Sequence, residues 1–202
     1  TALCGELLGA SSALYNRLNE GLLCSYGKWN TAPDHIGNVK PEGRICYDVI
    51  RNAQNEIYLV KNLPETSYAN SDPNVLLYNL KTYIGHLVRC NGEPAGSLCV
   101  VFQHDYEYTE NDRYIVRLLA LAIEGEETRE SLRRSTNRYR ELFDLAVEGI
   151  LTGSPDGIIT GANNSISQMT GYTASELVGR HISEVMFTKK SIEKNPFRFD
   201  LL

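Results

Sequence analysis

The feature that most constrains the fold of this chain is a continuous helical pattern that runs from residue 109 to residue 148. Thr109 is a favoured N-cap residue, acidic residues follow it in the first turn, and apolar residues then recur at helical spacing. Beyond Gly125 the pattern contains neither glycine nor proline, the residues that most often end a helix. Because helices of globular domains typically have about 8–20 residues, we expect this helix to begin in one domain and to end at the start of a second.

The two parts of this helix carry different patterns. The first part predicts a core helix whose buried face holds Ile115, Leu118, Leu119 and Ala122. The second part keeps a spacing of four and three residues, but Arg and Thr occupy seam positions where a stable coiled coil carries Leu or Ile. Such a seam favours a dimer helix that can change register, and it is equally compatible with a plain linker. The predicted signalling residues are Gly125, Arg129, Leu132, Thr136, Tyr139 and Phe143.

The composition is that of a soluble globular protein of one or two domains. The net charge of −5 and the interleaving of Arg with Glu along residues 124–141 argue against a nucleic-acid partner. No apolar run reaches the roughly 18 residues of a membrane span, so we predict no membrane contact in this stretch. The chain opens on Thr1, and we expect it to be a fragment of a longer protein. Five widely spaced cysteines favour reduced thiols of a cytoplasmic protein over a disulfide framework: Cys4, Cys24, Cys46, Cys90 and Cys99.

The part of the chain before residue 109 predicts an antiparallel α+β domain. The strongest local signal is Asn91-Gly92, a two-residue hairpin turn between strands at 82–89 and 96–102. In the second of these strands both faces are apolar, so it should be central and covered on both sides. The other expected elements are a helix within 1–10, a hairpin over 12–30, a loop over 31–43, a helix over 44–52, a strand at 57–60, a polar loop over 62–72 and a helix from Pro73.

The ordered series of segments over residues 58–123 resembles the second half of a GAF domain. The quoted parts are "DPNV", "TYIG", "NGEPAGSLCV" and "YTENDRYIVRLLA". With residues 14–29 as the first hairpin, the resemblance covers about residues 1–128. It implies a six-stranded antiparallel sheet with the N- and C-terminal helices on one face. On the other face it implies a small-molecule pocket roofed by residues 31–52 and 62–80, and a regulatory rather than an enzymatic role.

Five residues are candidates for the pocket of such a domain: Trp29, Cys46, Tyr47, Tyr68 and His86. His86 shares a strand face with Ile84 and Val88, where a buried imidazole needs a partner or a ligand. A hydrogen bond to the backbone or to a Tyr is the favoured interpretation, ahead of a metal or haem ligand. For Cys46 a core thiol is favoured over a reactive one, and for the aromatic residues packing is favoured over ligand contact.

Signatures of known catalytic and cofactor sites are missing. The chain contains no Gly-x-Ser-x-Gly, no P-loop and no His-Glu-x-x-His, and no bilin or haem attachment motif. We therefore predict no catalytic residue and no metal site in this fragment. The cofactor stays unidentified, with haem as an alternative that we do not favour. A Cys-based methionine sulfoxide reductase of the GAF type is a further alternative, and it requires two or three cysteines within disulfide reach.

Residues 138–185 resemble the beginning of a PAS domain. Two short strands flank the turn Ser154-Pro155-Asp156-Gly157, and a helix from Asn163 ends at Gly171. Thr173 and Glu176 form a capping box, and Gly179 follows as a stop. Only about half of such a domain is present, so whether the complete PAS domain binds a cofactor stays open.

Together these patterns predict a GAF domain over residues 1–124, a connecting signalling helix over 125–140 and a partial PAS domain over 141–202. We expect the cytoplasmic sensory region of a signal-transduction protein, with a homodimer formed through the helices and a small ligand of unknown identity in the GAF pocket. The output domain would be a histidine kinase, with a diguanylate cyclase next in order. The alternative is a GAF domain that only dimerises and binds no ligand.

Overall fold

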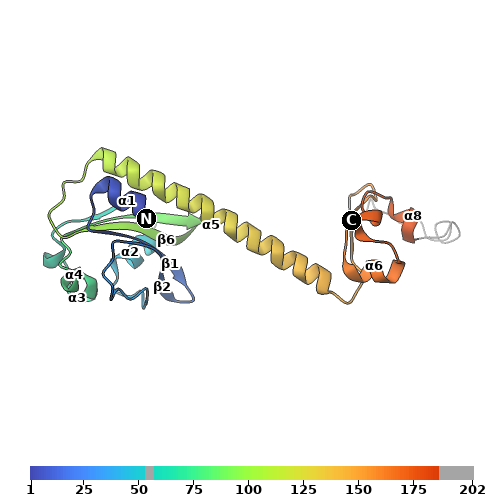
Figure 1. The fold of residues 1–202 in the computed structure, drawn as a ribbon, viewed down its shortest axis with the longest axis horizontal. Helices are drawn as coiled ribbons and strands as arrows, with labels where there is room; N and C mark the ends of the chain where they lie inside the picture. The colour runs from blue at the N-terminus through green and yellow to red at the C-terminus, as the bar shows by residue number, and fades with distance from the viewer. Residues whose placement is uncertain (53–56, 187–202) are drawn as a thin grey trace. The chain divides into compact units, whose positions relative to one another are not determined.

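The computed structural model describes residues 1–52 and 57–186 of the chain, and Figure 1 shows its fold. The described residues form two compact units, one of residues 1–131 and one that begins at Leu132. The predicted domain boundaries after residues 124 and 140 both fall inside one helix, so they stay predictions.

The first unit is built on one antiparallel sheet of six strands in the order β3-β2-β1-β6-β5-β4. This architecture confirms the predicted α+β class and the six-stranded sheet. Strand β6, predicted to be central, lies between β1 and β5. The strands are β1 (Ser12–Asn19), β2 (Leu22–Trp29), β3 (Asn38–Val39), β4 (Ile57–Val60), β5 (Thr82–Cys90) and β6 (Glu93–Phe102).

Helices cover both faces of this sheet (Figure 1). Side chains alternate along β6: Leu98, Val100 and Phe102 enter one buried cluster, whereas Cys99 and Val101 enter the other. The first cluster is covered by α1 (Ala2–Leu8) and α5 (Glu110–Leu145), and the second by α2 (Ile45–Arg51), η1 (Leu63–Glu65), α3 (Tyr68–Ser71) and α4 (Pro73–Leu77). The resemblance-based placement of the terminal helices on one face is thus confirmed.

Helix α5 begins where the sequence predicts. Asp112 Oδ2 accepts hydrogen bonds from the backbone nitrogen of Thr109 at 2.8 Å and from its hydroxyl at 2.9 Å, which satisfies donors that the first turn leaves free. The predicted buried face was partly wrong. Leu118 is 68% exposed, and the fully buried positions are Val116 and Ala120.

The correction has a geometric reason. Positions 112, 116 and 120 lie four apart and form the centre of the buried stripe, and Ile115, Leu119 and Ile123 pack at its margins. Leu118 is two residues from the centre of this stripe, and two residues turn an α-helix through about 200°. Leu118 and the exposed Ala122 therefore face away from the sheet.

Two predicted loops contain short regular elements. Residues 31–43 include β3, which pairs with β2 through only two residue pairs, and residues 62–72 include η1 and α3. Elements of two to four residues span no more than about one period of a hydrophobic pattern, so the sequence shows no repeat from which to predict them. The hairpin prediction is confirmed, since Asn91 and Gly92 have φ angles of 53° and 84°.

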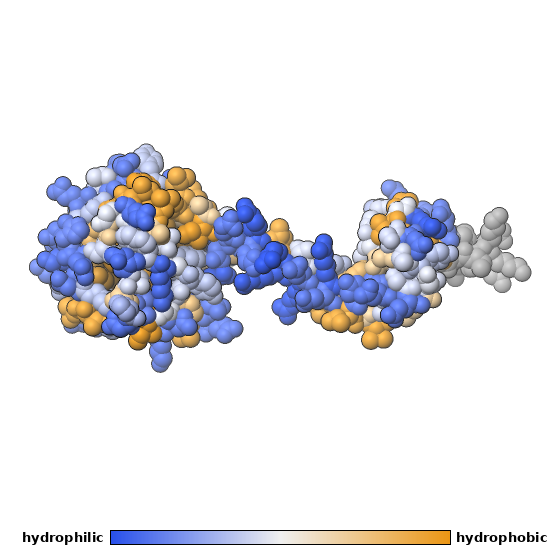
Figure 2. All heavy atoms as spheres, in the orientation of Figure 1, coloured by the Kyte–Doolittle hydropathy of each residue, from blue (hydrophilic) through white to orange (hydrophobic). Residues whose placement is uncertain are grey.

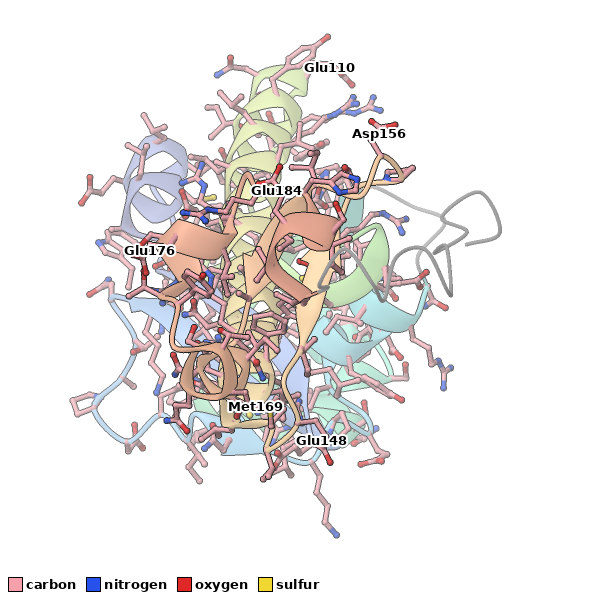
Figure 3. The ribbon with its side chains drawn as sticks, turned by 90° about the vertical axis from the view of Figure 1, so that its right-hand side faces the viewer. Glu110, Glu148, Asp156, Met169, Glu176 and Glu184 are labelled. Atoms are coloured by element: carbon pink, nitrogen blue, oxygen red, sulfur yellow. The ribbon has the colours of Figure 1, made fainter. Side chains whose placement is uncertain are left out.

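The second unit contains β7 (Leu151–Gly153), β8 (Ile159–Ala162), α6 (Asn164–Thr170), α7 (Ala174–Leu177) and α8 (Ile182–Met186). The predicted caps are confirmed: Asn163 caps α6, Gly171 ends it in the left-handed conformation, and Thr173 and Glu176 form the capping box of α7. Figure 3 labels Glu176 on α7 and Glu184 on α8, both exposed. The predicted PAS segment beyond residue 186 lies outside the described residues.

Asn163 is the polar centre of this unit and is fully buried. Its Oδ1 accepts from the backbone nitrogens of Ile150 at 2.8 Å and Ile166 at 3.0 Å. Its Nδ2 donates to the carbonyl oxygens of Phe143 at 3.0 Å and Glu148 at 2.9 Å. All four hydrogen bonds that the amide can make are therefore formed.

Across residues 1–52 and 57–186, no helix combines the length and the apolar character that crossing a bilayer requires.

The close approach of α1 to β2 yields a prediction about Gly5. A Cβ atom at Gly5 would lie 2.2 Å from a ring carbon of Trp29. We expect Gly5→Ala to lower the free energy of unfolding by about 1–3 kcal/mol, because the indole must move within a packed cluster. Urea denaturation followed by the fluorescence of Trp29, the single tryptophan of the chain, measures the change.

The control is Gly125→Ala, at a helical position of α5 with open space around it. This variant should gain up to about 1 kcal/mol from helix propensity. An unchanged midpoint for Gly5→Ala would contradict the contact between α1 and Trp29.

Candidate functional site

A cavity of about 130 Å³ lies in the first unit, on the sheet face that α2 and α4 cover. Its floor is formed by β1, β2 and β6, and its rim by the segment 30–36, the start of α2 and the start of α4. The lining combines apolar side chains with convergent polar groups, as ligand sites in proteins do. The lining residues with polar or sulfur-containing side chains include Asn16, Ser25, His35, Arg44, Cys46, Asp72, Tyr83 and Cys99.

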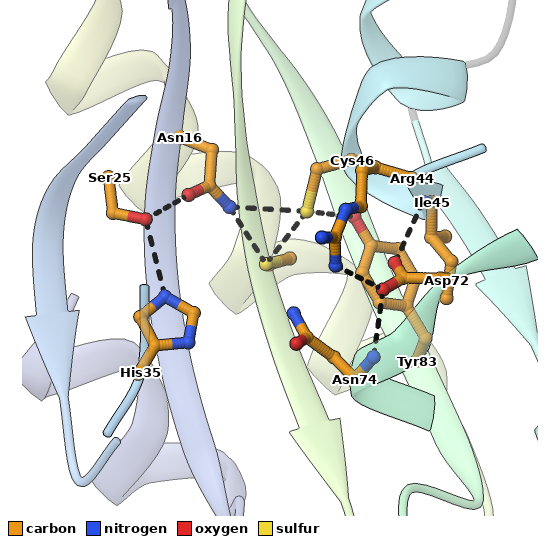
Figure 4. Close-up of polar contacts among 10 residues, drawn as sticks. Asn16, Ser25, His35, Arg44, Ile45, Cys46, Asp72, Asn74 and Tyr83 are labelled. Atoms are coloured by element: carbon orange, nitrogen blue, oxygen red, sulfur yellow. Dashed lines mark hydrogen bonds and ion pairs between the residues drawn. The ribbon is translucent and has the colours of Figure 1, made fainter. Parts of the chain in front are cut away.

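An ion pair fixes one wall of the cavity. Arg44 Nη1 lies 2.8 Å from Asp72 Oδ1, and the two side chains are 17% and 9% exposed. Asp72 also accepts hydrogen bonds from the backbone nitrogens of Ile45 at 3.2 Å and Asn74 at 3.1 Å. One carboxylate therefore joins the first turns of α2 and α4 (Figure 4).

A chain of polar side chains forms the opposite wall. Ser25 Oγ donates to Asn16 Oδ1 at 2.7 Å and lies 3.4 Å from His35 Nε2. Burial, followed by the nearby cations Lys28 and Arg44, lowers the pKa of His35 below 6.5. His35 therefore presents a neutral imidazole to the cavity at neutral pH.

Two cysteines meet at the floor of the cavity. Cys46 Sγ, from α2, lies 3.6 Å from Cys99 Sγ on β6. Cys46 Sγ also accepts from Asn16 Nδ2 at 3.2 Å and from the hydroxyl of Tyr83 at 3.4 Å (Figure 4). Sequence spacing gave no sign of this pair, because 53 residues separate the two cysteines.

The hydrogen bonds make the two thiols electrostatically unequal. The bond from Cys99, helped by the one from Tyr83, lowers the pKa of Cys46 against the effect of burial. The same bond and burial raise the pKa of Cys99 well above that of an ordinary thiol. Cys46 is therefore the member of the pair that ionises first.

The structure brings one of the five predicted pocket residues, Cys46, to the cavity. Trp29 packs against Gly5 on the face covered by α1 and α5. His86 lies on that same face with Ile84 and Val88, and its Nδ1 is 2.6 Å from the carbonyl oxygen of Leu87. Neither Trp29 nor His86 lines the cavity.

The two predicted tyrosines lie beside the cavity rather than in its lining. Tyr47 is on α2, with the Arg51 guanidinium 6.0 Å from its ring centroid. The hydroxyl of Tyr68 donates to Asp48 at 2.8 Å and lies 2.7 Å from the hydroxyl of Tyr58. Sequence reasoning missed Asn16, Ser25, His35, Arg44 and Asp72. The prediction of a pocket roofed by residues 31–52 and 62–80 covers only His35, Arg44 and Asp72.

The predicted signalling residues lie on a mostly exposed part of α5. Leu132 is 67% and Tyr139 is 58% exposed, and Arg129 pairs with Glu126 at 2.8 Å. Tyr139 stacks on Phe143 with ring centroids 5.7 Å apart. Gly125 and Thr136 are also exposed. Their role in a helix seam stays a prediction.

Strand β1 connects the cavity side of the sheet to α5. Asn16 bonds to Ser25 and Cys46 on the cavity side. The two residues that flank it face the other way: the hydroxyl of Tyr15 donates to Glu127 Oε1 at 2.8 Å, and the guanidinium of Arg17 pairs with Glu127 Oε2. Three consecutive residues thus join the lining of the cavity to helix α5.

Comparison with known proteins assigns a family model to the C-terminal part of the chain and a fold to the N-terminal part. Residues 137–198 match the family model of the PAS fold. No curated protein matches the chain in sequence.

Solved structures with low sequence identity match the first unit. A domain of a putative two-component sensor histidine kinase protein from Sinorhizobium meliloti 1021 aligns over 65% of this chain and 90% of its own, at 11% identity and a TM-score of 0.52. A phycoerythrobilin-bound GAF domain from a cyanobacterial phytochrome aligns over 66% and 84%, at 14% identity and a TM-score of 0.52. Free methionine-R-sulfoxide reductase from Neisseria meningitidis, in complex with its substrate, aligns over 64% and 75%, at 16% identity and a TM-score of 0.50. The first unit thus has a GAF-like fold.

The position of Asp72 gives a prediction about stability. We expect Asp72→Ala to lower the free energy of unfolding by on the order of 3 kcal/mol, because it leaves the half-buried Arg44 without its partner and removes the cap of α4. Asp72→Asn keeps an acceptor for the cap and should cost less. Urea denaturation measures both changes. Equal losses for the two variants would mean that the carboxylate charge, which both remove, carries the whole effect, and an unchanged stability of Asp72→Asn would mean that this charge is unimportant.

Proposed function

We propose that this chain is the cytoplasmic sensory region of a signal-transduction protein, which binds a small molecule in the cavity of the first unit and passes the change through α5. The observation that carries the proposal is the pair of contacts on β1. Asn16 bonds within the cavity, while Tyr15 and Arg17 hold Glu127 of α5. The PAS match and the GAF-like neighbours support a sensory role.

The mechanism requires a ligand that binds two states of β1 with different affinity. A ligand polar group that bonds to Asn16 or Ser25 would replace part of the hydrogen-bond chain that holds them now. Because Asn16 is a neighbour of Tyr15 and Arg17, a shift of its backbone alters the bonds to Glu127. A ligand shifts the equilibrium only by its difference in affinity for the two states.

The lining describes the class of ligand. Leu14, Ile45 and Val101 offer an apolar surface, whereas the polar groups lie on two walls, Ser25 and His35 on one and the Arg44–Asp72 pair on the other. We propose a small molecule that has an apolar part and polar groups for both walls. Haem is not favoured, since His86 lies on the opposite face of the sheet from the cavity.

The GAF-like and PAS-like domains suggest which output domain the full protein carries. A histidine kinase comes first, in line with the neighbour from a putative sensor kinase, and a diguanylate cyclase second. We propose that residues 1–202 themselves have no catalytic role. The residues of α5 from Gly125 to Phe143 are proposed to carry the signal to the output domain.

We further propose a homodimer formed through the helices of the first unit. Apolar side chains of α1 and α5 are exposed together, and Figure 2 shows apolar atoms gathered over these helices. A patch of this kind on a folded domain marks an interaction surface. Its members are Leu3 (54% exposed), Leu7 (56%), Tyr114 (66%), Leu118 (68%) and Leu121 (49%).

The ligand proposal predicts the behaviour of a cavity-filling variant. Native mass spectrometry of the protein purified from cells should show a small molecule bound to the wild type. Ser25→Phe should lose it, because the ring enters the cavity that the Ser25 hydroxyl now faces. The control is Ser175→Phe, at an exposed position of α7, which should keep the bound molecule. A molecule retained by Ser25→Phe would place the binding site elsewhere, and a wild type without any bound molecule would favour a GAF domain that only dimerises.

The dimer proposal predicts the effect of a charge on the apolar patch. Size-exclusion chromatography with light scattering should give the mass of a dimer for the wild type and of a monomer for Leu118→Arg, because burying an unpaired guanidinium is costly. Asn70→Arg adds the same charge to an exposed position of α3, on the opposite side of the sheet from the patch, and should leave the dimer intact. A monomeric wild type at high concentration would contradict the proposal.

A second candidate function is reduction of free methionine sulfoxide. The contact that favours it is the 3.6 Å between Cys46 and Cys99, together with the reductase among the structural neighbours. An assay with free methionine-R-sulfoxide and dithiothreitol tests it. Turnover that disappears in Cys46→Ser would favour the enzyme over the sensor.

A further inference from the structure

The two cysteines at the floor of the cavity have the arrangement of a reactive thiol and its partner. Both cysteines line the cavity, but Cys46 is only half-buried, whereas Cys99, on β6, is 1% exposed. A small molecule that enters the cavity therefore meets Cys46 first. Their sulfur atoms, 3.6 Å apart, must approach by about 1.5 Å to reach the length of a disulfide bond, about 2.05 Å.

The surroundings of Cys46 stabilise a thiolate by geometry. Asn16 Nδ2, the Tyr83 hydroxyl and the Cys99 thiol lie within 3.2–3.6 Å of its sulfur atom. Three donors on one sulfur atom favour the anion, which is the nucleophilic form of cysteine. The lowered pKa of Cys46 and the raised pKa of Cys99 agree with this assignment of roles.

The other three cysteines lack this environment. Cys4 is buried, and burial raises its pKa to about 11. The thiol of Cys24 donates to the carbonyl oxygen of Leu22 at 3.8 Å, and that of Cys90 to the carbonyl oxygen of Glu127 at 3.6 Å. Cys24 is half-exposed and outside the cavity lining, so it serves as an internal reference for a cysteine outside the site.

We propose that Cys46 and Cys99 form a hydroperoxide-reactive pair that converts to an intramolecular disulfide at the floor of the cavity. The reaction needs no other ligand in the cavity, so it stands apart from the proposed sensing of a small molecule. The substrate class is a small hydroperoxide, because the cavity of about 130 Å³ admits only a small oxidant.

The reaction has two steps. The Cys46 thiolate attacks the terminal oxygen of the hydroperoxide, the S–O bond forms, the O–O bond breaks, and the leaving alkoxide takes a proton from water to give an alcohol. Cys99 then attacks the sulfur of the Cys46 sulfenic acid, the S–S bond forms, and hydroxide leaves with the proton of Cys99 as water. In sum, two thiols and one hydroperoxide give one disulfide, one alcohol and one water.

Oxidation also changes the bonds of Asn16. In the disulfide, Cys46 is no longer an anion or a thiol, and its sulfur becomes a weaker acceptor for Asn16 Nδ2. Asn16 lies between the two residues that hold Glu127, so the oxidised and reduced forms differ at the point where β1 contacts α5.

The test uses the full chain and hydrogen peroxide or tert-butyl hydroperoxide, with peptide mapping by mass spectrometry. The wild type should form a Cys46–Cys99 cross-link, and its rate should exceed the oxidation of Cys24 by about tenfold or more at neutral pH, because a thiolate reacts and a thiol does not. As the pH rises, the rate of cross-linking should reach its plateau below the pH range in which ordinary thiols ionise.

Cys99→Ser should stop at a Cys46 sulfenic acid that dimedone traps, and Cys46→Ser should form neither product. Cys24→Ser and Cys90→Ser are the matched controls and should behave as the wild type.

Three outcomes would overturn the proposal. The first is oxidation of Cys24 ahead of Cys46 in the wild type, a measurement that needs no variant to fold. The second is a dimedone adduct spread evenly over the cysteines of Cys99→Ser. The third is a cross-link produced by free methionine sulfoxide and not by hydroperoxide, which would assign the pair to the reductase.

Discussion

The alternation of side chains along the central strands is the constraint on which the rest of the first unit depends. Successive residues of a strand point to opposite faces. On β6 this rule sends Val100 to the helices α1 and α5 and Cys99 to the cavity side. On β1 it sends Asn16 to the cavity and Tyr15 to α5. The sheet is therefore both the wall of the cavity and the support of the long helix, and no separate connecting element is needed between them.

The short elements on the cavity side depend on polar bonds more than on length. Helices α2 and α4 have seven and five residues, too few to be stable by themselves. They are held by Val49 and Val75 in the buried cluster and by the carboxylate of Asp72, which bonds to both first turns. A site made of such elements is easier to move than the sheet beneath it, since its local stability rests on few contacts.

The architecture could be predicted from the sequence because its signals are local. The Asn91-Gly92 turn, the two apolar faces of β6, the cap at Thr109 and the capping box at Thr173 each depend on residues within a few positions of one another. The site could not be predicted in the same way. Cys46 and Cys99 are brought together by the packing of α2 on β6, and Asn16, His35 and Asp72 come from three separate segments. Trp29 and His86 have the chemistry of pocket residues, but the alternation of side chains along their strands places them on the face that α1 and α5 cover.

The bonds of Asn163 have a consequence for α5 at its C-terminal end. The last four carbonyl groups of a helix have no partner within it, and the carbonyl of Phe143 is one of these. Its partner is the amide of Asn163, which belongs to the core of the second unit rather than to the helix. Unwinding the last turn of α5 would therefore break this bond and leave one N–H of the buried Asn163 amide without an acceptor. Fraying of α5 at this end would cost the second unit's core a hydrogen bond, so the last turn is part of that core as much as of the helix.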